Sequence, residues 1–227
     1  MKTSFYTVIC YLLPLTIVAE VIVYDNRADP INAIFAPFSD FSELQQNADD
    51  FILGTDQQIN GVMWTGAYFN DDLLADDTFT IRFFNDDGTN MSPAVVPLAE
   101  FSLDSVNRFD TGIDVFGSDV YQYETTFQEP FEADAGILYW ISIMNDTPSD
   151  SDAWAWVDGG LGNSAFRSFD SVLWNSDPGN TNELDFKLVA TIPEPGSISL
   201  FLSMLGCFLV FVCRRQKMFE GHSHPMG

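Results

Sequence analysis

The middle of the chain contains many short runs in which apolar and polar residues alternate, and this alternation predicts β-strands. In residues 78–84 it places Phe79, Ile81 and Phe83 on one face and polar side chains on the other. The run stops at residues 85–88, Asn-Asp-Asp-Gly, whose residue types tolerate positive φ and therefore predict a turn. Helical periodicity is nearly missing from this part of the chain.

The other runs complete the prediction of the fold. Residues 137–144 are apolar almost throughout, so they predict a central strand. A helical pattern is found only at residues 38–46, where Ser39 or Ser42 could cap a short helical turn. Many short strands separated by Gly, Asp and Asn turns favour an all-β fold, an antiparallel β-sandwich of the jelly-roll type. The remaining strands are expected at residues 20–24, 51–53, 58–69, 95–103, 115–116, 120–127, 153–157, 164–169 and 184–191.

The first residues have the layout of a secretory signal peptide. Lys2 precedes an apolar run over residues 5–19, and Ala19 is a small residue suited to a cleavage site. Ile17, at the third position back, is bulkier than the usual residue there, so an uncleaved signal anchor is the alternative. We interpret residues 1–19 as a signal peptide and expect the segment after it to be exported.

A second apolar run covers residues 197–213 and carries no charge. At about 1.5 Å per residue it just spans a hydrocarbon core of roughly 30 Å if flanking groups snorkel. Pro193 and Pro195 precede the run and, because proline lacks a backbone donor, keep the segment from continuing a strand. Basic residues follow it and mark the cytoplasmic side by the positive-inside rule. These basic residues are Arg214, Arg215 and Lys217.

A Pro-Glu-Pro element, a membrane run and an arginine pair in this order resemble the PEP-CTERM sorting signal. That signal is found on exported proteins of Gram-negative bacteria that make extracellular polysaccharide. The resemblance implies that a membrane-embedded exosortase recognises the element, cuts near it and passes the exported domain to the cell surface or matrix. It is confined to about the last seventh of the chain. The matching residues are Pro193, Glu194 and Pro195, the helix expected at 198–212, and Arg214 with Arg215.

The tail after the arginines, residues 216–227, is longer than this family pattern leads us to expect. An ordinary single-span anchor that is never cut is therefore the alternative. We divide the chain into a signal peptide (1–19), an exported domain (20–192), a sorting signal (193–217) with a transmembrane helix (197–213), and a cytoplasmic tail (218–227).

The charge of the exported domain is strongly one-sided. Of the 33 acidic residues in the chain, all except Glu194 and Glu220 lie between residues 20 and 192. Such a surface repels phosphates, so we expect no nucleic-acid partner. Acidity keeps an exported domain soluble and can collect divalent cations, but it does not identify a ligand. The basic residues in the same range are Arg27, Arg82, Arg108, Arg167 and Lys187.

Cysteine and histidine are missing from the exported domain. Cys10 lies in the signal peptide, Cys207 and Cys213 lie in the membrane run, and His222 and His224 follow it. The domain therefore has no disulfide, thiol nucleophile, imidazole base or usual zinc ligand. Its stability must come from core packing alone, which a chain of this length allows.

One enzymatic alternative remains, a glycoside hydrolase that uses a pair of carboxylates. Because Asp and Glu are so abundant here, finding two at a suitable separation would be uninformative. Most of them are expected on the surface and in turns. We therefore prefer a non-enzymatic domain.

Several Asp- and Asn-rich segments offer hard oxygen ligands for calcium on expected loops. The carboxylates of Asp146, Asp150 and Asp152 could reach one ion if their loop curls. None of these segments matches the EF-hand pattern. Solvated turns in a very acidic protein are the preferred interpretation, and we expect no cofactor other than this candidate calcium.

Tryptophans are the candidate ligand-binding aromatics, because sandwich domains often stack flat rings on sugar faces. Trp154 and Trp156 are two residues apart and share one face of a strand. Packing between the sheets is the preferred role for this pair, with a sugar platform as the alternative. Trp140 lies in the most apolar strand and is expected in the core.

These observations together predict an exported, non-enzymatic protein of the cell surface or extracellular matrix, held in the envelope by its membrane helix before processing. Exopolysaccharide is a partner that the family resemblance suggests. A carbohydrate-binding or calcium-dependent adhesion module is the first alternative, and the glycoside hydrolase is the second.

Overall fold

The computed structural model describes residues 18–26, 35–69, 77–104, 106–115, 117–147, 152–168, 173–176 and 182–193. Every element of regular secondary structure in these residues is a β-strand, so the all-β prediction is confirmed. One compact unit is formed by Glu20–Thr191, and a second by the terminal segments 1–19 and 192–227. The predicted membrane helix and nearly all of the predicted signal peptide lie outside the described residues.

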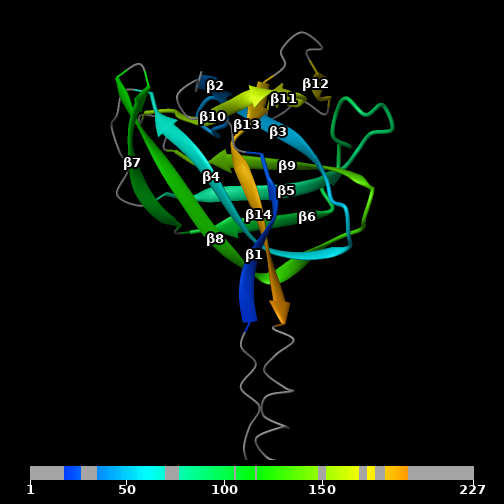
Figure 1. The fold of residues 1–227 in the computed structure, drawn as a ribbon. Helices are drawn as coiled ribbons and strands as arrows, with labels where there is room; N and C mark the ends of the chain where they lie inside the picture. Colours follow the sequence, from blue (N-terminus) through cyan, green and yellow to red (C-terminus); the bar gives the residue numbers. More distant parts are fainter. Residues whose placement is uncertain are drawn as a thin grey trace, which may run out of the picture. The chain divides into compact units, whose positions relative to one another are not determined.

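The strands form two antiparallel sheets, shown in Figure 1. The eight-stranded sheet contains β1 (Val18–Asp25), β2 (Phe35–Phe38), β4 (Gln57–Tyr68), β7 (Asn107–Val115), β8 (Ser118–Ala133), β10 (Trp154–Leu161), β13 (Asn182–Leu184) and β14 (Phe186–Pro193). The six-stranded sheet contains β3 (Gln45–Ile52), β5 (Phe79–Asn85), β6 (Ala99–Leu103), β9 (Leu138–Asn145), β11 (Ser164–Ser168) and β12 (Asn175–Ser176).

The long strand β4 organises the eight-stranded sheet. Strand β8 pairs along one edge of β4, whereas β14 and β10 follow one another along the other edge. Strand β1 lies beside β14, and β7 lies beside β8. The six-stranded sheet has the order β12-β11-β3-β9-β5-β6. Strand β9 is thus an interior strand, as its apolar sequence predicted.

The core lies between the two sheets and is mainly aromatic. In β5 the side chains of Phe79, Ile81 and Phe83 are fully buried, which confirms the predicted alternation. The ring of Phe83 stacks on that of Phe131 in β8, with centroids 4.3 Å apart, and so joins the two sheets. Offset and edge-on ring contacts of this kind stabilise a core beyond the burial of apolar area.

A smaller cluster covers the outer face of the six-stranded sheet. Trp140 is fully buried as predicted, but its neighbours in β9 face the main core while Trp140 points away from it. It packs with Phe84, Ala48 and Ala165, and the half-buried Trp174 lies against them.

The predicted helical turn at residues 38–46 is wrong. Strand β2 ends at Phe38, a turn follows at residues 41–44, and β3 begins at Gln45. Ser39 does not cap a helix, because its hydroxyl donates to the carbonyl oxygen of Ile143 at 2.6 Å. Contacts with distant strands therefore override the local helical pattern.

Gly66 in β4 provides the space for a buried tryptophan. A Cβ atom placed on Gly66 would lie 2.1 Å from Cζ2 of Trp154. We expect Gly66→Ala to lower the free energy of unfolding by about 2 kcal/mol or more, because overpacking a dense core forces side chains and backbone to shift. Gly54→Ala is the matched control, since nothing lies within 4 Å of a Cβ at that position. Urea unfolding of the two variants tests this, and equal stabilities would contradict it.

Candidate functional site

The predicted aromatic pair lies inside the molecule. Trp154 and Trp156 are both fully buried in the main core. Trp154 meets the ring of Phe79 edge-on at 5.1 Å, and the indole nitrogen of Trp156 donates to the carbonyl oxygen of Asp185 at 2.9 Å. Packing between the sheets is therefore their role, and neither ring is available as a platform for a sugar.

The structure describes two of the three carboxylates of the candidate calcium loop. Asp146 is exposed, Asp152 is buried, and Asp150 lies outside the described residues. Across the part of the chain that the structure describes, no three Asp, Glu, His or Cys side chains converge as metal ligands.

The acidic turn after β5 is satisfied by its own loop. One oxygen of Asp86 accepts the backbone N–H groups of Gly88 and Asn90 at 2.7 and 2.9 Å. Asp87 accepts from the hydroxyls of Thr89 and Ser92. Partial desolvation opposes these bonds, yet they hold the pKa of Asp87 below its usual value. The turn prediction is thus explained by local hydrogen bonds.

Of the sorting motif, the structure describes one residue. Pro193 is the last residue of β14, and Glu194, Pro195, Arg214 and Arg215 lie outside the described residues. In the stretches that are described, no helix is long and apolar enough to cross a membrane. The predicted span at 197–213 is not among those stretches.

The structure does form a polar groove on the outer face of the eight-stranded sheet. Its volume is about 170 Å³, and strands β1, β14, β4, β8 and β7 supply its walls. Figure 1 shows β1, β14 and β4 beside one another in this sheet. Two carboxylates, an amide, two hydroxyls and two apolar side chains line the groove. These residues are Glu20, Met63, Asn107, Glu124, Thr125, Thr126 and Val189.

This groove suits a ligand that is rich in hydroxyl groups. Carboxylate and carbonyl oxygens accept hydrogen bonds, the amide donates them, and threonine hydroxyls do both. Met63 and Val189 add apolar surface, which ligand sites also use. Sequence reasoning missed this groove, because its residues come from five strands that are widely separated along the chain.

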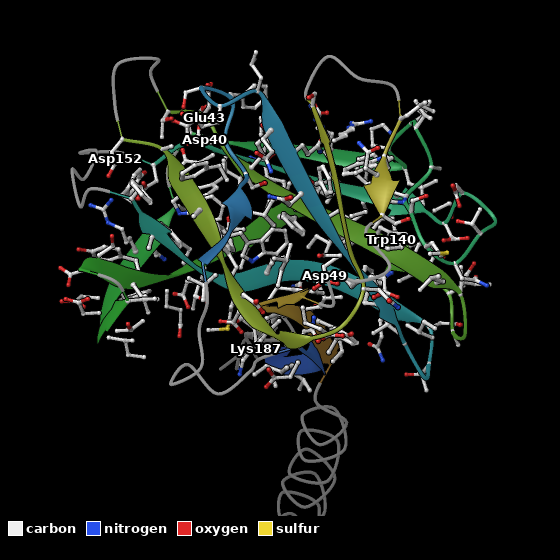
Figure 2. All side chains as sticks on the ribbon, turned by 90° about the horizontal axis from the view of Figure 1, so that it is seen from above. Asp40, Glu43, Asp49, Trp140, Asp152 and Lys187 are labelled. Atoms are coloured by element: carbon white, nitrogen blue, oxygen red, sulfur yellow. The ribbon has the colours of Figure 1, made fainter. Side chains whose placement is uncertain are left out.

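A second group of polar residues is buried between the sheets around Asp49, labelled in Figure 2. Asp49 accepts from the backbone N–H of Leu184 and, at 3.1 Å, from the amide of Asn26. Burial nevertheless raises the pKa of Asp49 well above the usual range. Burial also raises the pKa of Asp50 and of Glu183, and the charge of Asp50 adds to the effect on Glu183.

A third polar group ties the two sheets together near the start of β5. The hydroxyl of Tyr68 donates to Asp77, and the amide of Asn145 donates to that hydroxyl at 2.9 Å. Arg108 pairs with the other oxygen of Asp77 at 2.9 Å. Burial raises the pKa of Tyr68 above its ordinary value, so the phenol remains protonated and acts as a donor. We interpret this network as structural, since the carboxylate of Asp77 accepts from both Tyr68 and Arg108.

The architecture and the groove define an all-β domain of two packed sheets, stabilised without cysteine and carrying a polar groove on one outer face. The chain belongs to the DUF7901 family, described as a domain of unknown function, whose model matches residues 29–191. Among curated proteins, none matches this chain.

The buried carboxylates predict an unusual pH dependence of stability. When the pKa of a carboxyl group is higher in the folded state than in the unfolded state, the folded chain binds protons more readily. Its stability therefore falls as pH rises from the ordinary carboxyl pKa through the pKa of the folded state. Glu183→Gln removes one of these charges. We expect the variant to match wild type near pH 4 and to be more stable by about 0.5 kcal/mol toward pH 8.

The control for this prediction is Glu129→Gln, which removes an exposed carboxylate from β8 and matches the change in net charge. Urea unfolding between pH 4 and pH 8 is the measurement. If both variants gain stability equally as pH rises, the gain reflects net charge and the assignment to the Asp49 cluster is wrong.

Proposed function

We propose that this protein is an exported, non-enzymatic component of the cell surface or extracellular matrix, sorted through its Pro-Glu-Pro tail. In this proposal, residues 1–19 direct export and the helix at 198–212 holds the protein in the membrane. An exosortase-like enzyme then processes it near Pro193 to Pro195. The domain is displayed afterwards, with exopolysaccharide as its candidate partner.

The strand pairing supports the jelly-roll topology within this proposal. Eight strands, β1, β3, β4, β5, β6, β8, β9 and β14, pair first with last, second with seventh, third with sixth and fourth with fifth. Such nested pairing is the pattern of a jelly roll, a two-sheet fold that is found in lectin and viral capsid domains. Strand β7 with its turn and the segment from β10 to β13 are then insertions into this eight-stranded pattern.

The observation that carries the proposal is the position of the last strand. Strand β14 ends at Pro193, the first residue of the motif, and it lies beside β1 in the same sheet. Figure 1 shows that β1 begins and β14 ends at the same end of this sheet. A cut after β14 would therefore leave every core strand in place, and the released domain would remain folded.

A variant of the motif tests the sorting proposal. Replacing Pro193, Glu194 and Pro195 together by alanine should leave export intact but trap the protein in its unprocessed membrane form. The control replaces His222, Ser223 and His224 by alanine in the same tail. Intact mass of the protein from envelope and medium is the measurement.

Wild type and the tail control should both yield a species that ends near Pro193 to Pro195. A motif variant that is processed like wild type would show that the motif is not recognised. A wild-type species that retains Arg214 and Arg215 would instead establish a permanent single-span anchor.

The polar groove favours a second candidate function, the binding of a neutral carbohydrate. Glu124→Gln should weaken binding by about tenfold or more, because it replaces a charged acceptor by a neutral amide. Glu129→Gln lies on the same strand outside the groove and should bind as wild type does. A glycan array with and without calcium identifies the ligand, and calorimetry on that glycan compares the variants. Equal affinities would rule out the groove.

A further inference from the structure

Arg167 is a buried cation on the outer face of the six-stranded sheet. It lies on β11 under the cover formed by the loop after β5 and by Trp174, and 8% of its surface is exposed. Its guanidinium carbon is 4.4 Å from the centre of the Trp174 ring and 5.7 Å from that of Phe84. Aromatic faces attract a guanidinium, so these rings help to hold the charge in place.

The hydrogen-bond partners that Arg167 has in the described part of the chain are all neutral. Its Nε donates to Oε1 of Gln46 at 2.8 Å, and its Nη1 donates to the carbonyl oxygen of Val95 at 3.4 Å. In the described residues, the ion pairs of the other cations go to Glu100, Asp77 and Asp25, and none involves Arg167. A guanidinium has five N–H donors, so further donors remain for another acceptor.

A second arginine approaches the same oxygen. Nη1 of Arg82 lies 3.5 Å from Oε1 of Gln46, the atom that accepts from Arg167. Burial lowers the pKa of Arg167, and the like charge of Arg82 lowers it further. Burying a charge without an opposite partner is costly, and a neighbouring like charge adds to that cost. Arg82 already pairs with Glu100 at 2.7 Å, so an added anion beside the two arginines would mainly offset the charge of Arg167.

The surroundings of this pair differ from the rest of the acidic surface. The cover segments present the exposed apolar side chains of Val95, Val96 and Leu173. A net charge of −24 repels anions elsewhere, whereas here two of the few cations of the domain converge. The planar fork of an arginine matches the two oxygens of a carboxylate, which it binds with two parallel hydrogen bonds.

We propose that Arg167, supported by Arg82, binds the carboxylate group of an anionic ligand at this cover. The carboxylate would come from a free small acid or from a uronate on a polymer chain. This site lies on the opposite sheet from the polar groove and does not depend on the sorting route. A bound carboxylate would contact the same guanidinium that Val95 and Trp174 already contact.

The test measures the thermal midpoint and the affinity of the purified full-length protein with three probes. Sodium acetate supplies a free carboxylate, oligogalacturonate supplies polymer-borne carboxylates, and the methyl ester of oligogalacturonate is the neutral counterpart. Sodium chloride at equal ionic strength is the baseline. A ligand that binds the folded state raises the midpoint as its concentration increases. We expect such a rise with oligogalacturonate or with both acids, and none with the ester.

Arg167→Met keeps the length of the side chain and removes the fork and the charge. Replacing a buried charge by an apolar group of similar volume is often tolerated, so we expect this variant to fold. It should lose the carboxylate-dependent rise and bind at least tenfold more weakly, and Arg167→Lys should bind several-fold more weakly. Lys187→Met is the charge-matched control, since Lys187 pairs with Asp25 on the other sheet.

The two sources give different outcomes. A rise with both acids shows that any carboxylate suffices, and a rise with oligogalacturonate alone assigns the site to a polymer; both support the proposal. If neither acid raises the thermal midpoint of the wild-type protein above the chloride baseline, the proposal is wrong. This outcome needs no variant, so it holds whether or not the variants fold. An unchanged rise in Arg167→Met also overturns it.

Discussion

The packing of aromatic rings between the two sheets is the interaction on which the rest of the structure depends. Without cysteine in residues 20–192, no disulfide links the sheets. Phe83 of β5 illustrates the substitute, because its ring contacts those of Phe51 in β3, Phe101 in β6 and Phe131 in β8. Each such ring pair adds roughly 0.5–1.5 kcal/mol beyond the burial of its area. Three strands are thus fixed around one side chain, and the groove on the outer face depends on that arrangement.

Buried polar groups add specificity to this core. Aromatic rings tolerate several arrangements, but a buried carboxylate such as Asp77 is satisfied only where Tyr68 and Arg108 reach it. Asp40 acts in the same way, since it accepts from Thr147 at 2.6 Å and from the backbone N–H of Trp154 at 2.9 Å. A shift in strand register would leave these groups unpaired in the core. We therefore attribute the choice of one register to the polar contacts and most of the stability to the rings.

Much of the fold could be predicted from local pattern, and the site could not. Strand β5 is buried mainly on one face, which produces alternating apolar and polar residues. Strand β9 is buried on both faces, which produces a continuous apolar run. Both patterns can be recognised in the sequence. The helical prediction for residues 38–46 failed because Ser39 and Asp40 form hydrogen bonds to strands more than 100 residues away along the chain. Most of β7 was also missed, since this edge strand carries a bulge and its side chains are largely exposed.

The distribution of charge limits what can bind this domain. Each basic group that the structure describes is withdrawn from the surface: Arg82, Arg108 and Lys187 pair with carboxylates at 2.7–2.9 Å, and Arg167 packs under Trp174. The surface of the described residues is therefore almost purely negative, which favours solubility and repels anionic polymers at a distance. A neutral ligand meets mainly carboxylate and hydroxyl groups, as in the polar groove. An anionic ligand can gain a favourable contact only where a guanidinium lies close beneath the surface, and such contacts are short-ranged at physiological salt.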